Sequence, residues 1–326
     1  MKNILITGGT GSFGQAFVEF LLKKYKNKIK RIVIFSRDEF KQFHMANKFP
    51  TSKFPQMRYF IGDIRDKNRI ERALHKVDVV VHAAALKQIE AAEYNPIEFI
   101  KTNIIGAQNL VEACIDKKIK KIVALSTDKA VSPHNLYGST KLCSDKIFIS
   151  SNVYSGQDLK CSVVRYGNVL GSRGSVVPLF LSQKKSGQFP ITHKEMTRFN
   201  ITLAQSVEMV DWSINNSSGG EIVVPKLESY RVVDVAKAIN PKNTLKIIGV
   251  KRGEKIHEEL VSKNDGAYTI DIGKYYLILP DNTKKIINFY KKKFKFKRLA
   301  SNFSYSSNQK KYLSIKKIQN LISKIK

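Results

Sequence analysis

Two residues near the middle of the chain have types and a spacing suited to proton transfer. Tyr137 and Lys141 are four residues apart, so a helix would place both side chains on one face. A free tyrosine has a pKa of about 10, and a nearby ammonium group would lower this pKa by favouring the phenolate. The phenolate could then accept the proton of a substrate hydroxyl group. An exposed helical pair without a catalytic role is the alternative.

A second acid/base pair stands just before the first, in Ser126-Thr127-Asp128-Lys129-Ala130. Thr127 is placed to hydrogen-bond the reacting hydroxyl group. An oxidation or an epimerisation needs only threonine, tyrosine and lysine, so Asp128 and Lys129 indicate a further proton-transfer step, unless they form an ordinary ion pair at a strand end. We expect Asp128 to be protonated during this step. We expect burial and nearby positive charge to lower the pKa of Lys129.

A glycine-rich segment near the N-terminus predicts a dinucleotide site. It carries the spacing G-x-G-x-x-G at Gly9, Gly11 and Gly14, after a predicted strand over 2–7 and before a predicted helix over 13–25. Such a loop lets the backbone approach a pyrophosphate at the start of a helix. The expected contacts are Gly8, Thr10, Gly11, Ser12, Phe13 and Gly14.

The end of the second predicted strand favours NADP over NAD. Arg37 can pair with a 2′-phosphate, whereas the neighbouring Asp38 argues mildly for the free 2′-hydroxyl group of NAD. Asp63 follows the third predicted strand and either touches the adenine or simply caps a helix. The remaining cofactor contacts that we expect are Ser36, Lys41, Ile64, Ala83, Lys87, Tyr137 and Lys141.

Strand-like and helix-like segments alternate through the first half of the chain. The predicted strands are 2–7, 31–36, 58–61, 78–82, 121–126 and 161–165, and helix-like spacing covers 67–74 and 95–114. This alternation predicts an α/β fold with a Rossmann-like, doubly wound parallel sheet and a smaller mixed C-terminal lobe that holds the substrate. We divide the chain into a cofactor domain (1–166), a substrate lobe that partly packs back on it (167–281) and a basic extension (282–326).

The net charge of +30 is unevenly placed, because the residues after Asp281 include 14 Lys and Arg and no acidic residue. Lysine outnumbers arginine 45 to 12, which indicates a compositional bias rather than a nucleic-acid-binding surface. A solvated tail, or weak docking on an anionic membrane surface or acidic partner, would explain the basic extension.

The remaining composition indicates a cytoplasmic enzyme without metal or membrane span. No apolar run approaches the length of a membrane span, and Cys114, Cys143 and Cys161 have no metal-binding spacing. We interpret His82 as a core residue. We interpret the acidic and histidine residues over 254–259, including Glu258, as solvated charges at a helix start.

Six motifs run in one order: Thr-Gly-Gly-Thr-Gly-Ser-Phe-Gly (7–14), Ser-Arg-Asp-Glu (36–39), His-Ala-Ala-Ala-Leu-Lys (82–87), Ser-Thr-Asp-Lys-Ala (126–130), Asn-Leu-Tyr-Gly-Ser-Thr-Lys-Leu (135–142) and Arg-Tyr-Gly-Asn-Val (165–169). In this combination the chain resembles the inverting UDP-N-acetylglucosamine 4,6-dehydratases of the extended short-chain dehydrogenase/reductase superfamily. The resemblance runs from Asn3 to about Leu279 and recurs at 305–307. It implies a tightly bound, recycled NADP, a homo-oligomer and a place in bacterial surface-glycan or pseudaminic acid biosynthesis.

The resemblance also implies a substrate site for UDP-N-acetylglucosamine. Its expected residues are Lys87, Asn168, Arg173, Gly174, Ser175, Val176, Thr192, Arg198, Lys251, Arg252 and Glu254. The chain departs from the family pattern at Asn200, where a tryptophan is usual. It also departs at Lys251-Arg252, where Arg-Pro is usual, which concerns nucleotide affinity because arginine and lysine bind phosphate differently.

By resemblance, Tyr137 serves oxidation at C4, Lys129 takes the C5 proton and Asp128 protonates the departing C6 hydroxyl group. Enzymes that retain the C5 configuration carry Asp-Glu where this chain has Asp128-Lys129, so we expect inversion. The alternatives are a C5-retaining dehydratase, a UDP-sugar 4-epimerase that would not use Asp128 and Lys129, a non-catalytic NADP or nucleotide-sugar sensor, and a basic polymer-binding scaffold.

Overall fold

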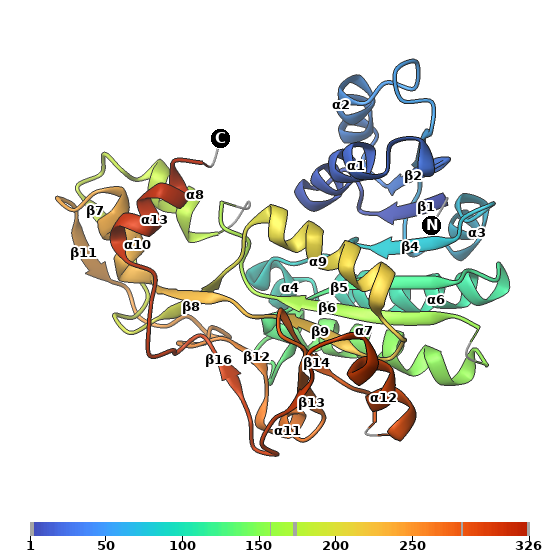
Figure 1. The fold of residues 1–326 in the computed structure, drawn as a ribbon. Coiled ribbons are helices and arrows are strands. Elements are labelled where there is room, and N and C mark those ends of the chain that lie inside the picture. Colours follow the sequence, from blue (N-terminus) through green and yellow to red (C-terminus); the bar gives the residue numbers. More distant parts are fainter. Residues whose placement is uncertain (1–2, 157, 172–174, 282, 325–326) are drawn as a thin grey trace.

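The computed structural model describes residues 3–156, 158–171, 175–281 and 283–324. Its centre is a ten-stranded sheet in the order β15-β13-β14-β9-β6-β5-β4-β1-β2-β3 (Figure 1). All neighbours from β3 to β9 run parallel. Their bounds are Asn3–Thr7 (β1), Arg31–Ser36 (β2), Met57–Ile61 (β3), Val79–His82 (β4), Lys121–Thr127 (β5), Lys160–Tyr166 (β6) and Ile222–Pro225 (β9). Beyond β9, β14 (Tyr275–Ile278) runs antiparallel to it. The predicted doubly wound α/β sheet is confirmed.

Helices cover the sheet on both faces, which explains why its central strands are buried along most of their length rather than at every second residue. All four residues of β4 are buried. Helix α1 contacts α9, whereas α6 contacts α3 and α7, and the two groups lie on opposite faces. Their bounds are Ser12–Tyr25 (α1), Lys67–Ala73 (α3), Gly106–Asp116 (α6), Leu136–Tyr154 (α7) and Leu203–Asn216 (α9).

The strand order changes direction between β1 and β4, where doubly wound sheets bind their ligands. At the carboxyl ends of these strands, Thr7 of β1 pairs in register with Phe35 of β2 on one side and with His82 of β4 on the other. On β5, the strand beyond β4, Thr127 is the last residue and is paired with Tyr166. Parallel pairing therefore brings the glycine loop, the end of β2 and the residues after β5 to one edge.

One predicted helix is interrupted. Instead of a continuous helix over 95–114, the chain forms α5 (Pro96–Phe99), a π-helical turn (Ile100–Ile105) and then α6. The turn contains Asn103, whose side chain hydrogen-bonds the backbone of Leu86 through both N–H and C=O, at 2.9 Å each, and also Thr140. These bonds fix the segment after β4 against α7, and an apolar spacing pattern does not report them.

A second, smaller core lies at the left of Figure 1. It includes Phe180, Phe189 and Val235. Two small sheets and two helices surround it: β7 (Gln188–Ile191) with β11 (Thr244–Ile247), β8 (Thr197–Asn200) with β10 (Glu228–Arg231), α8 (Val176–Ser182) and α10 (Val232–Ile239). This lobe faces the carboxyl end of the main sheet, so a site between the two can hold a ligand.

The basic segment after residue 282 joins both parts. Strand β15 (Lys297–Arg298) extends the main sheet beside β13 (Thr269–Asp271), and β16 (Tyr305–Ser306) pairs with β12 (Glu259–Val261). Helix α13 (Ile315–Ile322) packs on α10, and α12 (Lys284–Lys293) buries Ile287 and Tyr290 while its lysines stay exposed. Within the described part of the chain no helix is long and apolar enough to cross a membrane.

Candidate active site

The glycine loop after β1 has the geometry that a pyrophosphate requires. Gly8 has a φ of +63°, and a Cβ there would lie 2.8 Å from the backbone nitrogen of Ala84, so only glycine fits. A Cβ on Gly14 would overlap the carbonyl oxygen of Gly9, which lets helix and strand pack closely. Helix α1 starts without a side-chain cap and without an acidic residue in its first turn. Its first N–H groups and positive helix end therefore suit an anionic group.

The predicted cofactor residues gather along this edge of the sheet. Gly8, Thr10, Gly11, Ser12, Phe13 and Gly14 form the loop and the start of α1; Ser36, Arg37 and Asp38 end β2, with Lys41 in the following helix; Asp63 and Ile64 follow β3; Ala83 and Lys87 follow β4.

Just after β2, the side chains of Arg37 and Asp38 differ in how far they are already bound to neighbouring residues. Asp38 caps α2 (Glu39–Lys48) by accepting from the backbone N–H of Lys41 at 2.9 Å, and it pairs with the Lys41 ammonium at 2.7 Å. These two bonds from Lys41 lower the pKa of Asp38. The Arg37 side chain is 47% exposed and has one long contact, 3.4 Å to Asp63. Arg37 is therefore free to pair with an anion, whereas the Asp38 carboxylate is engaged.

The catalytic residues predicted from the sequence lie together at the end of β5. Asp128–Ala130 forms a short 3-10 turn, and α7 follows with Asn135 as its cap, which accepts from the N–H of Gly138 at 2.8 Å. Gly138 allows α7 to pack on that turn, because a Cβ there would overlap the carbonyl oxygen of Lys129. Tyr137 and Lys141 both lie on α7, four residues apart as the spacing predicts, and both are buried.

Burial raises the pKa of Tyr137 to about 12, although Lys129 and a hydrogen bond from Thr127 favour the phenolate. The predicted lowering of this pKa is wrong for the protein alone, because desolvation outweighs the two neighbours. Burial also lowers the pKa of Lys141, and Asp145 opposes this shift. Asp145 is buried one further turn along α7 and accepts a hydrogen bond from Ser126 at 2.7 Å.

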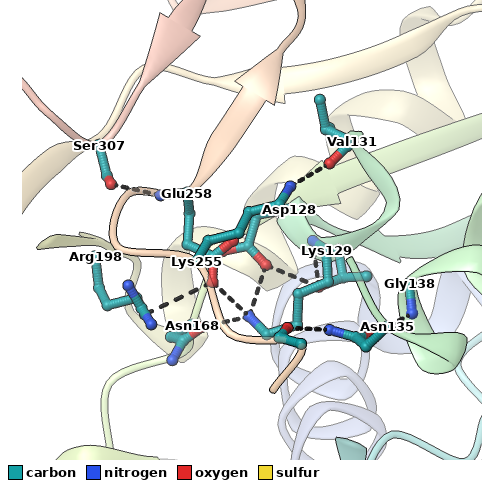
Figure 2. Close-up of polar contacts among 12 residues, drawn as sticks. Asp128, Lys129, Val131, Asn135, Gly138, Asn168, Arg198, Lys255, Glu258 and Ser307 are labelled. Atoms are coloured by element: carbon teal, nitrogen blue, oxygen red, sulfur yellow. Dashed lines mark hydrogen bonds and ion pairs between the residues drawn. The ribbon is translucent and has the colours of Figure 1, made fainter. Parts of the chain in front are cut away.

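Lys129 lies at the centre of a polar cluster (Figure 2). Its ammonium is 3.0 Å from Asp128 Oδ1, 3.3 Å from Asn168 Oδ1 and 3.3 Å from Glu258 Oε1. Burial alone would lower the pKa of Lys129, but the carboxylates of Asp128 and Glu258 raise it above its ordinary value. The predicted lowering is therefore wrong for the protein alone, because the prediction took Asp128 as protonated and did not include Glu258. Burial raises the pKa of Asp128, in the predicted direction.

Glu258 is the residue that the sequence interpretation missed. No helix starts at 254–259; the segment leads into β12, and the Glu258 side chain is 3% exposed. The solvated-helix interpretation is wrong for this residue. Glu258 is also 3.6 Å from the guanidinium of Arg198. Its one sequence signal is its place two residues before Leu260, because alternate residues of a strand share a face and Leu260-Val261 predicts a buried strand.

A cavity of about 620 Å³ opens between the two lobes and includes Lys129 and Glu258 in its wall. Of the predicted substrate residues, Asn168, Ser175, Val176, Thr192, Arg198, Lys251 and Glu254 line it. Arg252 lines a neighbouring cleft beside His134. Lys87 is exposed and does not line the cavity, and Arg173 and Gly174 lie outside the described residues.

Two cations at this cavity are held in different ways. Arg198 is 9% exposed and donates to the backbone carbonyls of Thr197 and Ile256, which fixes its direction. Lys251 is exposed and pairs with Glu90 on α4 (Ile89–Tyr94) at 2.7 Å, which raises the pKa of Lys251. At the position that departs from the family pattern the cavity therefore has an exposed lysine paired with Glu90, whereas Arg198 is buried and fixed by backbone carbonyls.

Two further kinds of chemistry can be checked in the described residues: metal binding, and acid/base chemistry at His82. No three His, Cys, Asp or Glu side chains there are placed to hold a metal ion. His82 is buried, and its Nδ1 lies 2.8 Å from the hydroxyl group of Thr7. Burial lowers the pKa of His82 to about 3, so it is a neutral core residue, as predicted.

Comparisons with known proteins agree with this arrangement. The inverting UDP-N-acetylglucosamine 4,6-dehydratase of Campylobacter jejuni is 49% identical over 94% of this chain and 92% of that protein. The UDP-glucose 4-epimerase of Rickettsia prowazekii is 42% identical over 98% of this chain and 95% of that protein. The solved structure of Pen from Bacillus thuringiensis matches with a TM-score of 0.87 at 33% identity, covering 99% of this chain and 97% of that chain. The family described as polysaccharide biosynthesis protein matches residues 4–280, and the chain belongs to this family together with the inverting UDP-N-acetylglucosamine 4,6-dehydratases.

Proposed function

We propose that this chain converts UDP-N-acetylglucosamine into a UDP-2-acetamido-2,6-dideoxy-L-arabino-hexos-4-ulose, by 4,6-dehydration with inversion at C5. The observation that carries the proposal is the Asp128–Lys129 pair, 3.0 Å apart, in which Lys129 lines the cavity between the lobes and Asp128 is buried beside it. A 4-epimerase has no use for this second acid/base pair. The similarity to the Campylobacter jejuni dehydratase supports the same function.

The first step is the loss of the C4 hydroxyl proton to Tyr137. Thr127 orients this hydroxyl group and hydrogen-bonds the phenol, and the positive charge of Lys129 favours the phenolate. A bound nicotinamide dinucleotide supplies the oxidant for C4 and later returns the reducing equivalent to C6. A ketone at C4 makes the neighbouring C5 proton acidic.

The second step is the removal of water. Lys129 takes the C5 proton, and Asp128 protonates the C6 hydroxyl group as it departs. C5 is later reprotonated on the face opposite to the one from which Lys129 removed the proton, so its configuration is inverted. Asp128 suits the acid role because burial raises its pKa, and Lys129 can act as a base only after it has released a proton.

We also propose NADP as the cofactor. Arg37 is exposed beside the end of β2 with a single long contact, so it can pair with a 2′-phosphate. The loop over 8–14 and the uncapped start of α1 would hold the pyrophosphate, and Tyr137 and Lys141 would lie beside the nicotinamide ribose. The division into a cofactor domain (1–166) and a substrate lobe (167–281) follows from this assignment, with the cavity between them for the sugar.

We assign the UDP portion to the cavity wall formed by the smaller lobe. Arg198 is rigid and buried and suits a phosphate oxygen, while Thr192 and Val176 line the same cavity. Lys251 would contact the nucleotide as a mobile point charge, in place of the family arginine. Arg173 and Gly174 stay in the assignment on resemblance alone.

Proton NMR of the purified protein with UDP-N-acetylglucosamine in deuterated water tests this function. We expect a new C6 methyl signal, deuterium at C5 and ring couplings of the L-arabino product. A methyl signal with D-xylo couplings would contradict inversion. Conversion to the galacto isomer without a methyl signal would establish an epimerase, the function named for the Rickettsia prowazekii relative. The same spectra recorded with Lys129→Met are the control for adventitious activity.

A further inference from the structure

Glu258 is held rigidly by a segment far away in sequence. Its backbone N–H donates to Ser307 Oγ at 2.9 Å, and its carbonyl oxygen accepts from the Ser307 N–H at 2.7 Å. The hydroxyl group of Ser307 lies 2.7 Å from that of Thr197 on β8. The backbone of Glu258 is therefore fixed at both its N–H and its carbonyl group, while its side chain lies in the polar cluster.

The Glu258 carboxylate lies between two cations. Its Oε1 is 3.3 Å from Lys129 and 3.6 Å from Arg198. Burial would raise the pKa of Glu258, but Lys129, Arg198 and, from the same loop, Lys255 lower it below its ordinary value. Asp128 has Lys129 as its one cationic contact among the described residues, so Glu258 is the carboxylate that stays ionised when Lys129 loses its proton.

The hydrogen bonds of Lys129 show that it must release a proton before it can act. An ammonium group has three N–H donors, and Lys129 Nζ has three acceptors, on Asp128, Asn168 and Glu258. In this state the nitrogen has no lone pair for a substrate. Of the three acceptors, the Asn168 amide cannot take a proton, and Glu258 is held ionised by Arg198. Asp128 is therefore the acceptor that can take this proton, because burial and, less strongly, the charge of Glu258 raise its pKa while the charge of Lys129 opposes them.

We propose that Glu258 is a positioning residue for the dehydration step: held by Arg198, it anchors Lys129 beside Asp128 and directs the proton that Lys129 releases to Asp128. This inference rests on the proposed dehydratase function. The proton transfer leaves the total charge of the cluster unchanged and prepares both partners at once, because Lys129 gains a lone pair and Asp128 gains the proton that the leaving group needs.

The elimination then balances within the pair. The lone pair of Lys129 takes the C5 proton, the electrons of that C–H bond form the C5–C6 double bond, and the C6–O bond breaks. The Asp128 proton goes to the departing hydroxyl group, which leaves as water. Lys129 ends as an ammonium and Asp128 as a carboxylate, the ion pair that Figure 2 shows.

Glu258→Gln tests the proposal, with Glu259→Gln as its matched control. Glu259 carries the same charge on the next residue and contributes no contact to the cavity wall. For each purified holoenzyme, three quantities are measured with UDP-N-acetylglucosamine: the absorbance of the reduced nicotinamide after rapid mixing, the rate of C6 methyl formation by NMR, and KM. The thermal midpoint checks the fold.

In Glu258→Gln we expect reduced nicotinamide to form as in wild type, KM to stay within about threefold, and methyl formation to fall about 100-fold, the scale of a general acid/base contribution. Glu259→Gln should match wild type in all three. Methyl formation at the wild-type rate in Glu258→Gln would overturn the proposal. An equal loss of nicotinamide reduction and of methyl formation in Glu258→Gln would also overturn the proposal, because it would indicate that Glu258 has only a structural role.

Glu258→Asp keeps the charge but shortens the side chain, and it decides the question if the glutamine variant does not fold. We expect normal nicotinamide reduction with a smaller loss of methyl formation, about tenfold. Wild-type methyl formation in this variant, with no folded glutamine variant, would also count against the proposal. Failure of the proposed function is distinguishable, because wild type itself would then form no methyl product.

Discussion

The ammonium of Lys129 lies 3.0 Å from Oδ1 of Asp128, so the proposed base and the proposed acid of the dehydration share one hydrogen bond. One proton can therefore pass between them without solvent. Two functional groups that depend on one shared proton act as a unit, and removing either should have the same effect as removing both.

We expect Lys129→Met, Asp128→Asn and the double variant to lose dehydration to about the same extent, roughly 1000-fold. The measurement is C6 methyl formation for all three, with cofactor binding followed by fluorescence to confirm an intact nucleotide site. Lys146→Met, an exposed lysine on α7, is the control. A double variant whose loss equals the product of the single losses would show that the two residues act independently.

Arg37→Ala should weaken NADP binding by about 10- to 100-fold and leave NAD binding unchanged, because it removes a charge-assisted contact to the 2′-phosphate alone. Dissociation constants for both dinucleotides, by calorimetry, give the ratio. Arg58→Ala is the matched control, since Arg58 is exposed near the amino end of β3, away from the nucleotide edge. An unchanged ratio in Arg37→Ala would rule out the assigned contact.

Gly8→Ala should abolish cofactor binding and destabilise the fold by about 1–3 kcal/mol, since it combines a positive φ with a clash at Ala84. Gly156→Ala separates the two effects. Gly156 also has a positive φ, +68°, but among the described residues, its chain neighbours apart, no heavy atom lies within 4 Å of an added Cβ. Its expected cost is about 1 kcal/mol, with cofactor binding intact. Urea denaturation of both variants measures the difference, and equal costs would contradict the steric argument.

Acid should destabilise the fold through His82. Its pKa is about 3 in the folded protein and 6.5 when unperturbed, so the unfolded chain takes up the proton first as pH falls. Folding stability from this group is present above pH 6.5 and is lost as the pH falls toward 3. Between about pH 8 and pH 5, wild type should lose about 2 kcal/mol more than His82→Gln, measured by urea denaturation at each pH. Parallel pH profiles would show that His82 is not neutral in the core.

The sequence predicts those parts of the fold that depend on local patterns. Six strands of the parallel sheet, the glycine loop and the Tyr137–Lys141 pair follow from short-range spacing and lie where expected, whereas β9 was not predicted. The π-helical interruption before α6 was missed, because it follows from the bonds between Asn103 and Leu86, which lie 17 residues apart.

In the candidate site, too, contacts between residues close in sequence could be predicted and contacts between distant residues could not. Asp128 and Lys129 are adjacent in sequence, so their pairing could be predicted, but Glu258 lies 129 residues after Lys129 and reaches it only through the fold. The direction of the Lys129 pKa was wrong for that reason. Within the charged cluster over 254–259, the place of Glu258 two residues before Leu260 is the one local sign that it turns inward, and this sign does not identify Lys129 as its partner.

The two hydrogen bonds between Glu258 and Ser307 also determine when the catalytic centre can be assembled during synthesis. Strands β1 to β6 can pair as soon as the first half of the chain has emerged from the ribosome, so the dinucleotide edge forms early. Glu258 is fixed only when Ser307, 49 residues later, has emerged and bonded to it. A nascent chain would thus be able to hold its cofactor before it could eliminate water from a sugar.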